Sequence, residues 1–108
     1  MGEILVLSTA DSMELAVKIA RTIVDESRAA CVNIVPGVRS IYRWDGKLCD
    51  DSELLLLIKT SEENYKKVNS SIRNLHTYDT PEVISIPITA GDPEYLHWLR
   101  NQVHPRSD

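Results

Sequence analysis

The sequence predicts a single α+β domain with the element order β-α-β-β-α-β and one further helix at the C-terminal end. Short apolar runs alternate with stretches of 3.6-residue periodicity, which is the pattern of strands alternating with amphipathic helices. Two long strand-like segments flank an Asp-Gly turn. The length of 108 residues leaves little room for a second domain, so residues 1–108 form one unit. We expect an ordered core over about residues 3–103 and a frayed tail over 104–108.

The first strand is expected over residues 3–9, where a short apolar run suits the centre of a sheet. Asp11, with Glu14 three residues later, is the expected N-cap of a helix over 12–27. The apolar residues of this helix follow the spacing i, i+3, i+4, i+7, which predicts one buried stripe. They are Ala16, Ile19, Ala20 and Ile23.

A long hairpin is expected next, with strands over 30–44 and 47–60. Asp45-Gly46 suits a two-residue type I′ turn, and Pro36-Gly37 marks a bulge or bend in the first strand. The apolar run at 54–58 is expected to be buried on both faces. Each strand is ~45 Å long, whereas a compact domain of this size has a radius of gyration of ~13 Å, so the hairpin should project beyond its own core.

The projecting end of this hairpin carries large apolar side chains that a partner must cover. They are Ile41, Tyr42, Trp44 and Leu48. A closed homo-oligomer supplies such a partner most simply, so we expect these residues at a subunit interface. Burial in a neighbouring subunit also explains Trp44 better than stacking on a ligand does.

The two cysteines are not expected to form a disulfide. If Trp44 faces Lys47, then Cys49 faces Tyr42 and Cys31 faces Thr60. The cysteines then lie ~36 Å apart at ~3.3 Å per residue, far beyond the reach of a disulfide. A bulge at Pro36-Gly37 would shift this register by one residue and would not bring them together.

The second half of the chain is expected to contain a helix, a strand and a last helix. Thr60 is the expected cap of the first helix, with Glu63 at the capping-box position. The apolar stripe of that helix is Tyr65, Val68, Ile72 and Leu75. A strand follows over 83–90, where Pro87 indicates a sheet edge, and Asp92-Pro93 opens a helix through about residue 102. This order is the ferredoxin-like split βαβ arrangement.

Composition and charge exclude several classes of function. The net charge of −4 and the pI near 5.3 argue against a nucleic-acid binder. No apolar stretch approaches the ~20 residues of a membrane span, and the first residues lack the basic region of a secretory signal, so we expect a cytoplasmic protein. No pairing of a nucleophile with a base is visible, and we expect no enzymatic activity.

The segment 75–82 concentrates the residues that could carry chemistry. His76, Asp79 and Glu82 could form a weak divalent-ion site, and Tyr78 could help to clamp a polar ligand. An ordinary helix C-terminus followed by a turn has the same composition, and the residues alone leave both interpretations open. His97 and His104 are expected to be surface or packing residues. Trp98 is expected to be a packing residue, beside Leu96 and Leu99 on the last helix.

The hairpin also carries basic residues that could serve two purposes. Arg39 and Arg43 alternate along one strand, and the facing strand carries Asp50, Asp51 and Glu53, so cross-strand ion pairs are the simpler interpretation. Together with Lys59, the two arginines could instead supply positive charge to a cleft that binds a small anionic metabolite.

Several long motifs resemble the CutA divalent-cation tolerance family. The resemblance rests on the segments 29–37 (AACVNIVPG), 40–47 (SIYRWDGK), 58–60 (IKT) and 76–82 (HTYDTPE), followed by Gly91-Asp92, Tyr95-Leu96 and Trp98-Leu99. These motifs occur in the family's order from about residue 4 to residue 103.

The resemblance implies a ferredoxin-like protomer in a homotrimer built through its long hairpins, as in PII-like signalling proteins. It also implies a role in tolerance of copper and other divalent ions, with weak metal binding at an intersubunit site and no metal needed for folding. Copper-binding bacterial members have a cysteine where this chain has Ser8 and a histidine where it has Leu75, so only His76 matches. The alternative is a PII-like signalling or scaffolding module that binds an anionic ligand or a partner protein.

Overall fold

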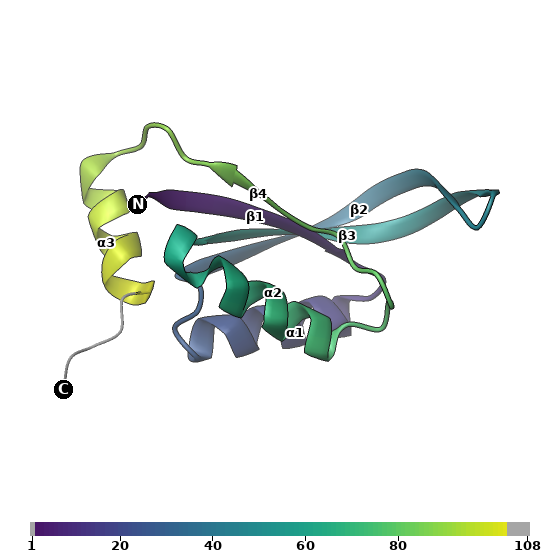
Figure 1. Cartoon of the computed structure of the whole chain (residues 1–108), viewed down its shortest axis with the longest axis horizontal. Helices are drawn as coiled ribbons and strands as arrows, with labels where there is room; N and C mark the ends of the chain where they lie inside the picture. Colours follow the sequence, from purple (N-terminus) through teal and green to yellow (C-terminus); the bar gives the residue numbers. More distant parts are fainter. Residues whose placement is uncertain (1, 104–108) are drawn as a thin grey trace.

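A four-stranded antiparallel sheet forms the centre of the computed structural model, which describes residues 2–103 (Figure 1). The strand order is β2-β3-β1-β4, so β2 and β4 are the edges. The elements are β1 (Glu3–Ala10), α1 (Met13–Asp25), β2 (Cys31–Trp44), β3 (Lys47–Ser61), the 3-10 turn η1 (Glu62–Asn64), α2 (Tyr65–Leu75), β4 (Val83–Pro87) and α3 (Pro93–Val103). This is the predicted order of elements.

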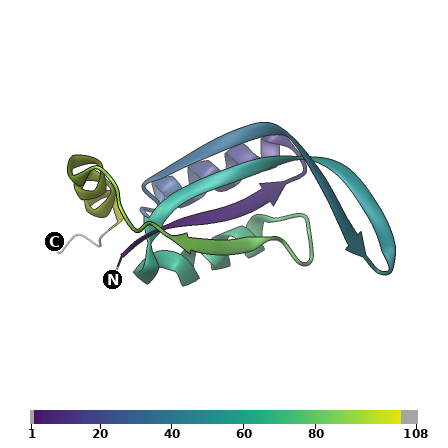
Figure 2. The same cartoon turned by 90° about the horizontal axis from the view of Figure 1, so that it is seen from above.

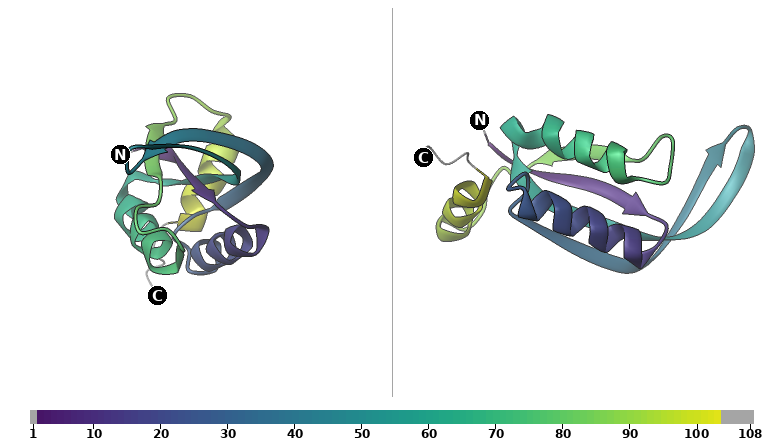
Figure 3. Two further views of the ribbon diagram at one scale, coloured as in Figure 1. Left: turned by 90° about the vertical axis from the view of Figure 1, so that its right-hand side faces the viewer. Right: turned by 90° about the horizontal axis from the view of Figure 1, so that it is seen from below.

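Helices α1 and α2 lie side by side on one face of the sheet, and α3 lies at one end (Figures 1 and 3). The covered face is apolar because every second residue of β1 and β3 points to it; Val6 and Ile58, which are register partners, are both fully buried. Ile19 of α1 and Ile72 of α2 pack against these strands without solvent exposure. The predicted stripes are confirmed for the most part: Ala16, Ile19, Ile23, Val68 and Ile72 are core residues, and Tyr65 and Leu75 are half-buried against them. Ala20 is only half-buried, and the buried Leu15 was not predicted.

The predicted helix caps were wrong for α1 and α2. The N-cap of α1 is Ser12 rather than Asp11, because the Ser12 hydroxyl accepts the hydrogen bond from the Leu15 amide at 3.1 Å. Thr60 does not cap a helix: it stays in β3, and its hydroxyl donates to the Arg28 carbonyl oxygen at 2.6 Å. In α3, by contrast, Asp92 accepts from the Tyr95 amide at 3.0 Å, which agrees with the prediction of a cap at that position.

The hairpin of β2 and β3 extends well beyond the helices, as expected from its length (Figures 1 and 2). The longest dimension of the molecule is 48 Å. Asp45 and Gly46 have φ angles of 51° and 74°, the left-handed values that a type I′ turn requires. An irregularity between Val35 and Val38 shifts the register by one residue, so Cys31 faces Lys59 rather than Thr60. Both cysteines are free.

Two further predictions need correction. Strand β4 ends at Pro87 and not at residue 90, although its position at the sheet edge was predicted. Trp98 is not packed inside the protomer: 42% of it is exposed, and its ring lies 5.6 Å from the ring of Tyr95. Leu99 instead anchors α3, because α3 turns that side chain toward the sheet and buries it fully. The predicted tail and His104 lie outside the described residues.

Within residues 2–103, neither α1 nor α2 lies over the second face of the sheet (Figure 2). The expected burial of the run 54–58 on both faces is therefore wrong for the protomer: Leu56 and Ile58 are fully buried, whereas Leu55 and Leu57 are half-buried. We call this second surface the open sheet face. The strand registers place on it Leu5, Leu7, Val35, Leu55, Leu57, Ile84 and Ile86.

Candidate functional site

A pocket of about 580 Å³ lies where the hairpin leaves the core. The projecting half of the hairpin supplies one part of its wall, and the loop between α2 and β4 supplies another. The residues that line it are Thr9, Ser40, Ile41, Tyr42, Trp44, Glu53, Tyr78, Asp79, Thr80 and Glu82. The pocket thus combines residues that we predicted for two separate roles, a subunit interface and a polar site.

Glu53 and Tyr78 join the two walls of this pocket. The Tyr78 hydroxyl donates a hydrogen bond to Glu53 Oε2 at 2.7 Å. Glu53 is only 7% exposed, although it follows the exposed part of β3 in the chain. Burial, and then the bond to Glu53, raise the pKa of the Tyr78 phenol above its ordinary value, so Tyr78 stays a donor at neutral pH.

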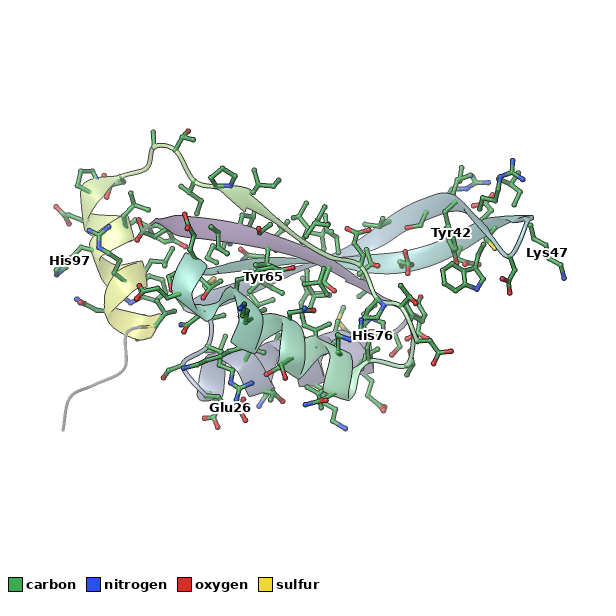
Figure 4. All side chains as sticks on the ribbon, in the orientation of Figure 1. Glu26, Tyr42, Lys47, Tyr65, His76 and His97 are labelled. Atoms are coloured by element: carbon green, nitrogen blue, oxygen red, sulfur yellow. The ribbon has the colours of Figure 1, made fainter. Side chains whose placement is uncertain are left out.

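A second phenol–carboxylate pair lies farther out on the hairpin. The Tyr42 hydroxyl donates to Asp51 Oδ2 at 2.5 Å, and this bond raises the pKa of Tyr42 to about 12. Tyr42 lies on the projecting part of the molecule, well away from the helices (Figure 4). The pair holds the aromatic ring in one position along the pocket wall.

His76 lies at the C-terminal end of α2, and both of its ring nitrogens are engaged (Figure 4). Its Nδ1 accepts a hydrogen bond from the Tyr78 amide at 3.0 Å. That nitrogen therefore carries no proton, and Nε2–H donates to the Thr9 carbonyl oxygen at 2.7 Å. The imidazole thus links β1 to the loop, and its ring lies 4.5 Å from that of Tyr78.

The predicted metal ligands are only partly brought together. Asp79 and Glu82 line the pocket, whereas His76 is not among the residues that line it. Within residues 2–103, no group of three or more His, Cys, Asp or Glu side chains is close enough to hold a metal ion. Ser8 is fully buried among the residues of the covered face, and its hydroxyl has no hydrogen-bond partner among the residues that the structure describes. The described part of one protomer therefore does not provide a complete set of ligands.

The predicted basic residues do not enter the pocket. Arg39 binds Asp50 through two hydrogen bonds of 2.9 and 2.7 Å, which is the cross-strand pair that the simpler interpretation anticipated. Lys59 donates to Asn33 near the other end of the sheet. Arg43 is likewise absent from the pocket lining. The structure therefore does not gather these three cations around one ligand.

Glu53 has a different partner from the one that the sequence predicts. We assigned it to a cross-strand ion pair, but it pairs with the phenol of Tyr78. The sequence contains one indication of its position. Glu53 directly precedes the apolar run at 54–58, and the alternation along a strand places it on the same face as Leu55 and Leu57. This position puts the carboxylate of Glu53 at the edge of the apolar open sheet face.

Comparison with known proteins gives consistent matches over nearly the whole chain. A family model described as "CutA1 divalent ion tolerance protein" matches residues 4–102. The "Divalent-cation tolerance protein CutA" of Thermus thermophilus is 50% identical over 98 residues, which cover 91% of this chain and 95% of that protein. A solved structure of a divalent cation tolerance protein (Cut A1) from the same species superimposes with a TM-score of 0.92 at 48% identity, covering 94% of this chain and 99% of the other.

Plant relatives are longer than this chain. "Protein CutA, chloroplastic" of Arabidopsis thaliana is 48% identical over 98 residues, which are 91% of this chain and 54% of the plant protein. This chain therefore corresponds to about half of that relative. In the part of the chain that the structure describes, no helix has the length and apolar character needed to cross a membrane.

Proposed function

Because this chain belongs to the CutA1 divalent ion tolerance family, we propose that it acts as a homotrimer that binds a divalent cation weakly at a boundary between subunits. The observation that carries the proposal is the open sheet face. On this face, apolar side chains of all four strands lie next to one another and are not covered by the helices. A large exposed apolar surface of this kind usually marks a site of association.

Exposure of this face supports assembly. Ile84 and Ile86 are 51% and 47% exposed in the protomer, and β-sheet faces of this kind are normally covered by another layer. The projecting hairpin adds Ile41, Trp44 and Leu48, which are 63%, 52% and 73% exposed. A closed ring of copies would cover the open sheet face and the hairpin end of each protomer at once. Tyr42 belongs to the same interface.

A cation site at the subunit boundary is consistent with the incomplete ligand set of one protomer. Asp79 and Glu82 contribute oxygen ligands from one subunit, and a neighbouring copy completes the coordination. Carboxylate oxygens suit hard divalent ions better than copper. His76 would join as a ligand only by giving up one of its two hydrogen bonds, so we expect copper to bind weakly and the fold to form without metal.

Native mass spectrometry tests both parts of the proposal. We expect a trimer in metal-free buffer, and three bound ions per trimer after addition of Mn²⁺ or Cu²⁺. The double variant Asp79→Asn/Glu82→Gln should remain trimeric and lose the bound ions, and His76→Ala should reduce only the uptake of copper. A monomer at micromolar concentration would refute the assembly, whereas a trimer without specific ions would refute the cation site alone.

We retain two further expectations from the sequence, a cytoplasmic location and the absence of enzymatic activity. The second is supported by the descriptions of the relatives, which name divalent-cation tolerance and no reaction. The alternative of an anionic ligand gains no support from the pocket, since Arg39, Arg43 and Lys59 lie outside it.

A further inference from the structure

We propose that the exposed face of α2 is a docking surface for an acidic segment of a partner protein. We call this surface the basic face of α2; it consists of Lys66, Lys67, Ser70, Arg73 and Asn74, which are all exposed. It lies on the side of the molecule away from the open sheet face (Figures 1 and 3). The proposed assembly covers the open sheet face and the hairpin end, so it leaves the basic face of α2 accessible. The inference depends neither on the trimer nor on a bound cation.

The helical repeat brings these five side chains together around Ser70. The two residues one turn before Ser70 are lysines, and the two residues one turn after it are Arg73 and Asn74. All five side chains can donate hydrogen bonds, and three of them carry a positive charge. A surface made only of donors favours an anionic partner that offers several acceptor oxygens.

Comparison with α1 shows that a single sign of charge is not a general feature of the exposed helix faces. In α1, Glu14 lies four residues before Lys18, and Arg21 lies four residues before Asp25. Opposite charges at this spacing stabilise a solvated helix without any partner. Helix α2 contains no acidic residue, and the ion pairs formed within residues 2–103 include none of its three cations.

The charges next to α2 do not neutralise its basic face. Arg28 lies beside it, because its Nη1 donates a hydrogen bond to the Lys67 carbonyl oxygen at 3.1 Å. Glu26 pairs with Arg28 at 3.3 Å and offsets the charge of that arginine. Glu62 and Glu63 precede α2 on η1, and among residues 2–103 they form no ion pair with the cations of the helix. Three positive charges therefore remain for a partner.

An acidic protein segment fits this surface better than a nucleic acid or a membrane does. The net charge of −4 opposes the approach of a long polyanion such as a nucleic acid. A helix that docks on a membrane carries exposed apolar side chains beside its basic ones, whereas the basic face of α2 consists of polar and charged residues.

The spacing of the cations also suits an extended acidic segment. Lys66 and Arg73 are seven positions apart in a helix, which corresponds to ~10 Å along its axis. An extended segment with an acidic residue at every second position presents carboxylates ~7 Å apart on one side. Two or three such carboxylates can pair with the surface at once, which is needed because each exposed ion pair contributes little by itself.

The test uses a fluorescein-labelled hexaglutamate peptide as the probe. Fluorescence anisotropy with the full chain at low ionic strength should show saturable binding, and labelled hexaglutamine, which has the same length and no charge, should not bind. Added salt should weaken the binding, because it screens exposed charges. Lys66→Gln/Arg73→Gln should weaken it by about tenfold, since each exposed ion pair contributes roughly two- to fivefold to an affinity.

Two control variants separate this surface from the charge of the whole chain. Lys18→Gln/Arg21→Gln removes the same number of charges from the exposed face of α1 and should change the affinity for hexaglutamate by less than about twofold. Lys66→Arg/Lys67→Arg keeps the charge of α2 and should bind as the original chain does.

Three results would overturn the proposal. In the first, hexaglutamate does not bind. In the second, the glutamine variants of α1 and α2 lose affinity equally, which would make the binding an effect of net charge. In the third, vesicles of phosphatidylserine bind the chain more tightly than hexaglutamate does, which would identify the surface as a membrane contact. A monomeric chain that binds hexaglutamate would support the proposal and contradict only the proposed assembly.

Discussion

The two faces of the sheet are built from the same kinds of residue, yet only one of them is covered within the protomer. Leu56 and Leu57 are neighbours in β3 and point to opposite faces; the first is fully buried beneath the helices and the second is half-buried. The two leucines differ in burial because successive side chains of a strand point to opposite faces, and because α1 and α2 cover only one of these faces. In the proposed assembly, a leucine on the open sheet face serves association, and a leucine on the covered face serves folding.

Truncation of these two neighbours should separate the two roles. Leu56→Ala should lower the free energy of unfolding by about 3 kcal/mol, because it leaves a cavity in a core that has no solvent contact. Leu57→Ala should cost about 1 kcal/mol in the isolated protomer. Chemical denaturation at several protein concentrations measures both. In the Leu57 variant the loss should depend on protein concentration more steeply than in the Leu56 variant.

Equal losses with equal dependence on concentration would show that the two faces do not differ in role. Leu55→Ala is a second variant of the open sheet face and should behave as Leu57→Ala does, since both leucines share one parity in β3.

A charge on the open sheet face should break assembly while the fold survives. Leu57→Lys places an ammonium group within the proposed interface, where its desolvation is unfavourable, whereas in a single protomer the same group reaches water. Sedimentation velocity should give the mass of one chain, and the circular dichroism spectrum should stay that of the original protein. A trimer that persists in this variant would place the interface elsewhere.

Much of the fold follows from the sequence because the signals that specify it are local. The Asp45-Gly46 turn and the periodicity of Ile19 and Ile23 depend on residues a few positions apart. The hydrogen bonds of the pocket are different: Tyr78 meets Glu53 across 25 positions, and His76 meets Thr9 across 67.

The bulge after Val35 and the end of α2 determine which distant residues come into contact. No local sequence pattern predicts these contacts. The sequence therefore singled out the segment 75–82 as one that could carry chemistry, but it did not identify Glu53 as the partner of that segment. For the same reason, Thr60 could be mistaken for a helix cap: its true partner, the Arg28 carbonyl, is 32 positions away.

The Ser8 hydroxyl lies within the apolar covered face, and its removal is expected to change stability less than the substitutions above. The Ser8 hydroxyl is fully buried without a hydrogen-bond partner, between the buried side chains of Val6 and Ala10 on the same face of β1. Ser8→Ala should raise the free energy of unfolding by about 1 kcal/mol, because a desolvated hydroxyl is removed and the chain keeps its shape. Thermal and chemical denaturation would measure the gain.

Ser71→Ala is the matched control for this prediction. Ser71 is also buried, but its hydroxyl accepts a hydrogen bond from Arg28 at 2.6 Å, so the same substitution there should destabilise the protein. If Ser8→Ala were destabilising as well, the hydroxyl of Ser8 would have a partner in solution.

The smallest effect is expected at alkaline pH, where the hairpin joins the open sheet face. Tyr42 has its pKa raised from 10.0 to about 12 by Asp51, and the pKa of Tyr78 is raised by burial and by Glu53. In both cases the folded protein keeps the phenol proton that the unfolded chain releases near its ordinary pKa. The two hydrogen-bonded phenols therefore stabilise the folded protein fully below about pH 10, and this stabilisation is lost as the pH rises through their folded-state pKa values.

Tyr78→Phe should remove the larger part of this pH dependence, since Tyr78 is the more deeply buried of the two phenols, and Tyr42→Phe should remove the smaller part. Chemical denaturation between pH 9 and 12, followed together with tyrosinate absorbance, separates the two contributions. If stability declined identically in the original chain and in Tyr78→Phe, the bond to Glu53 would not fasten the hairpin to the loop. The pocket would then open in solution, and the two walls that place Glu53 beside Asp79 and Glu82 would move independently.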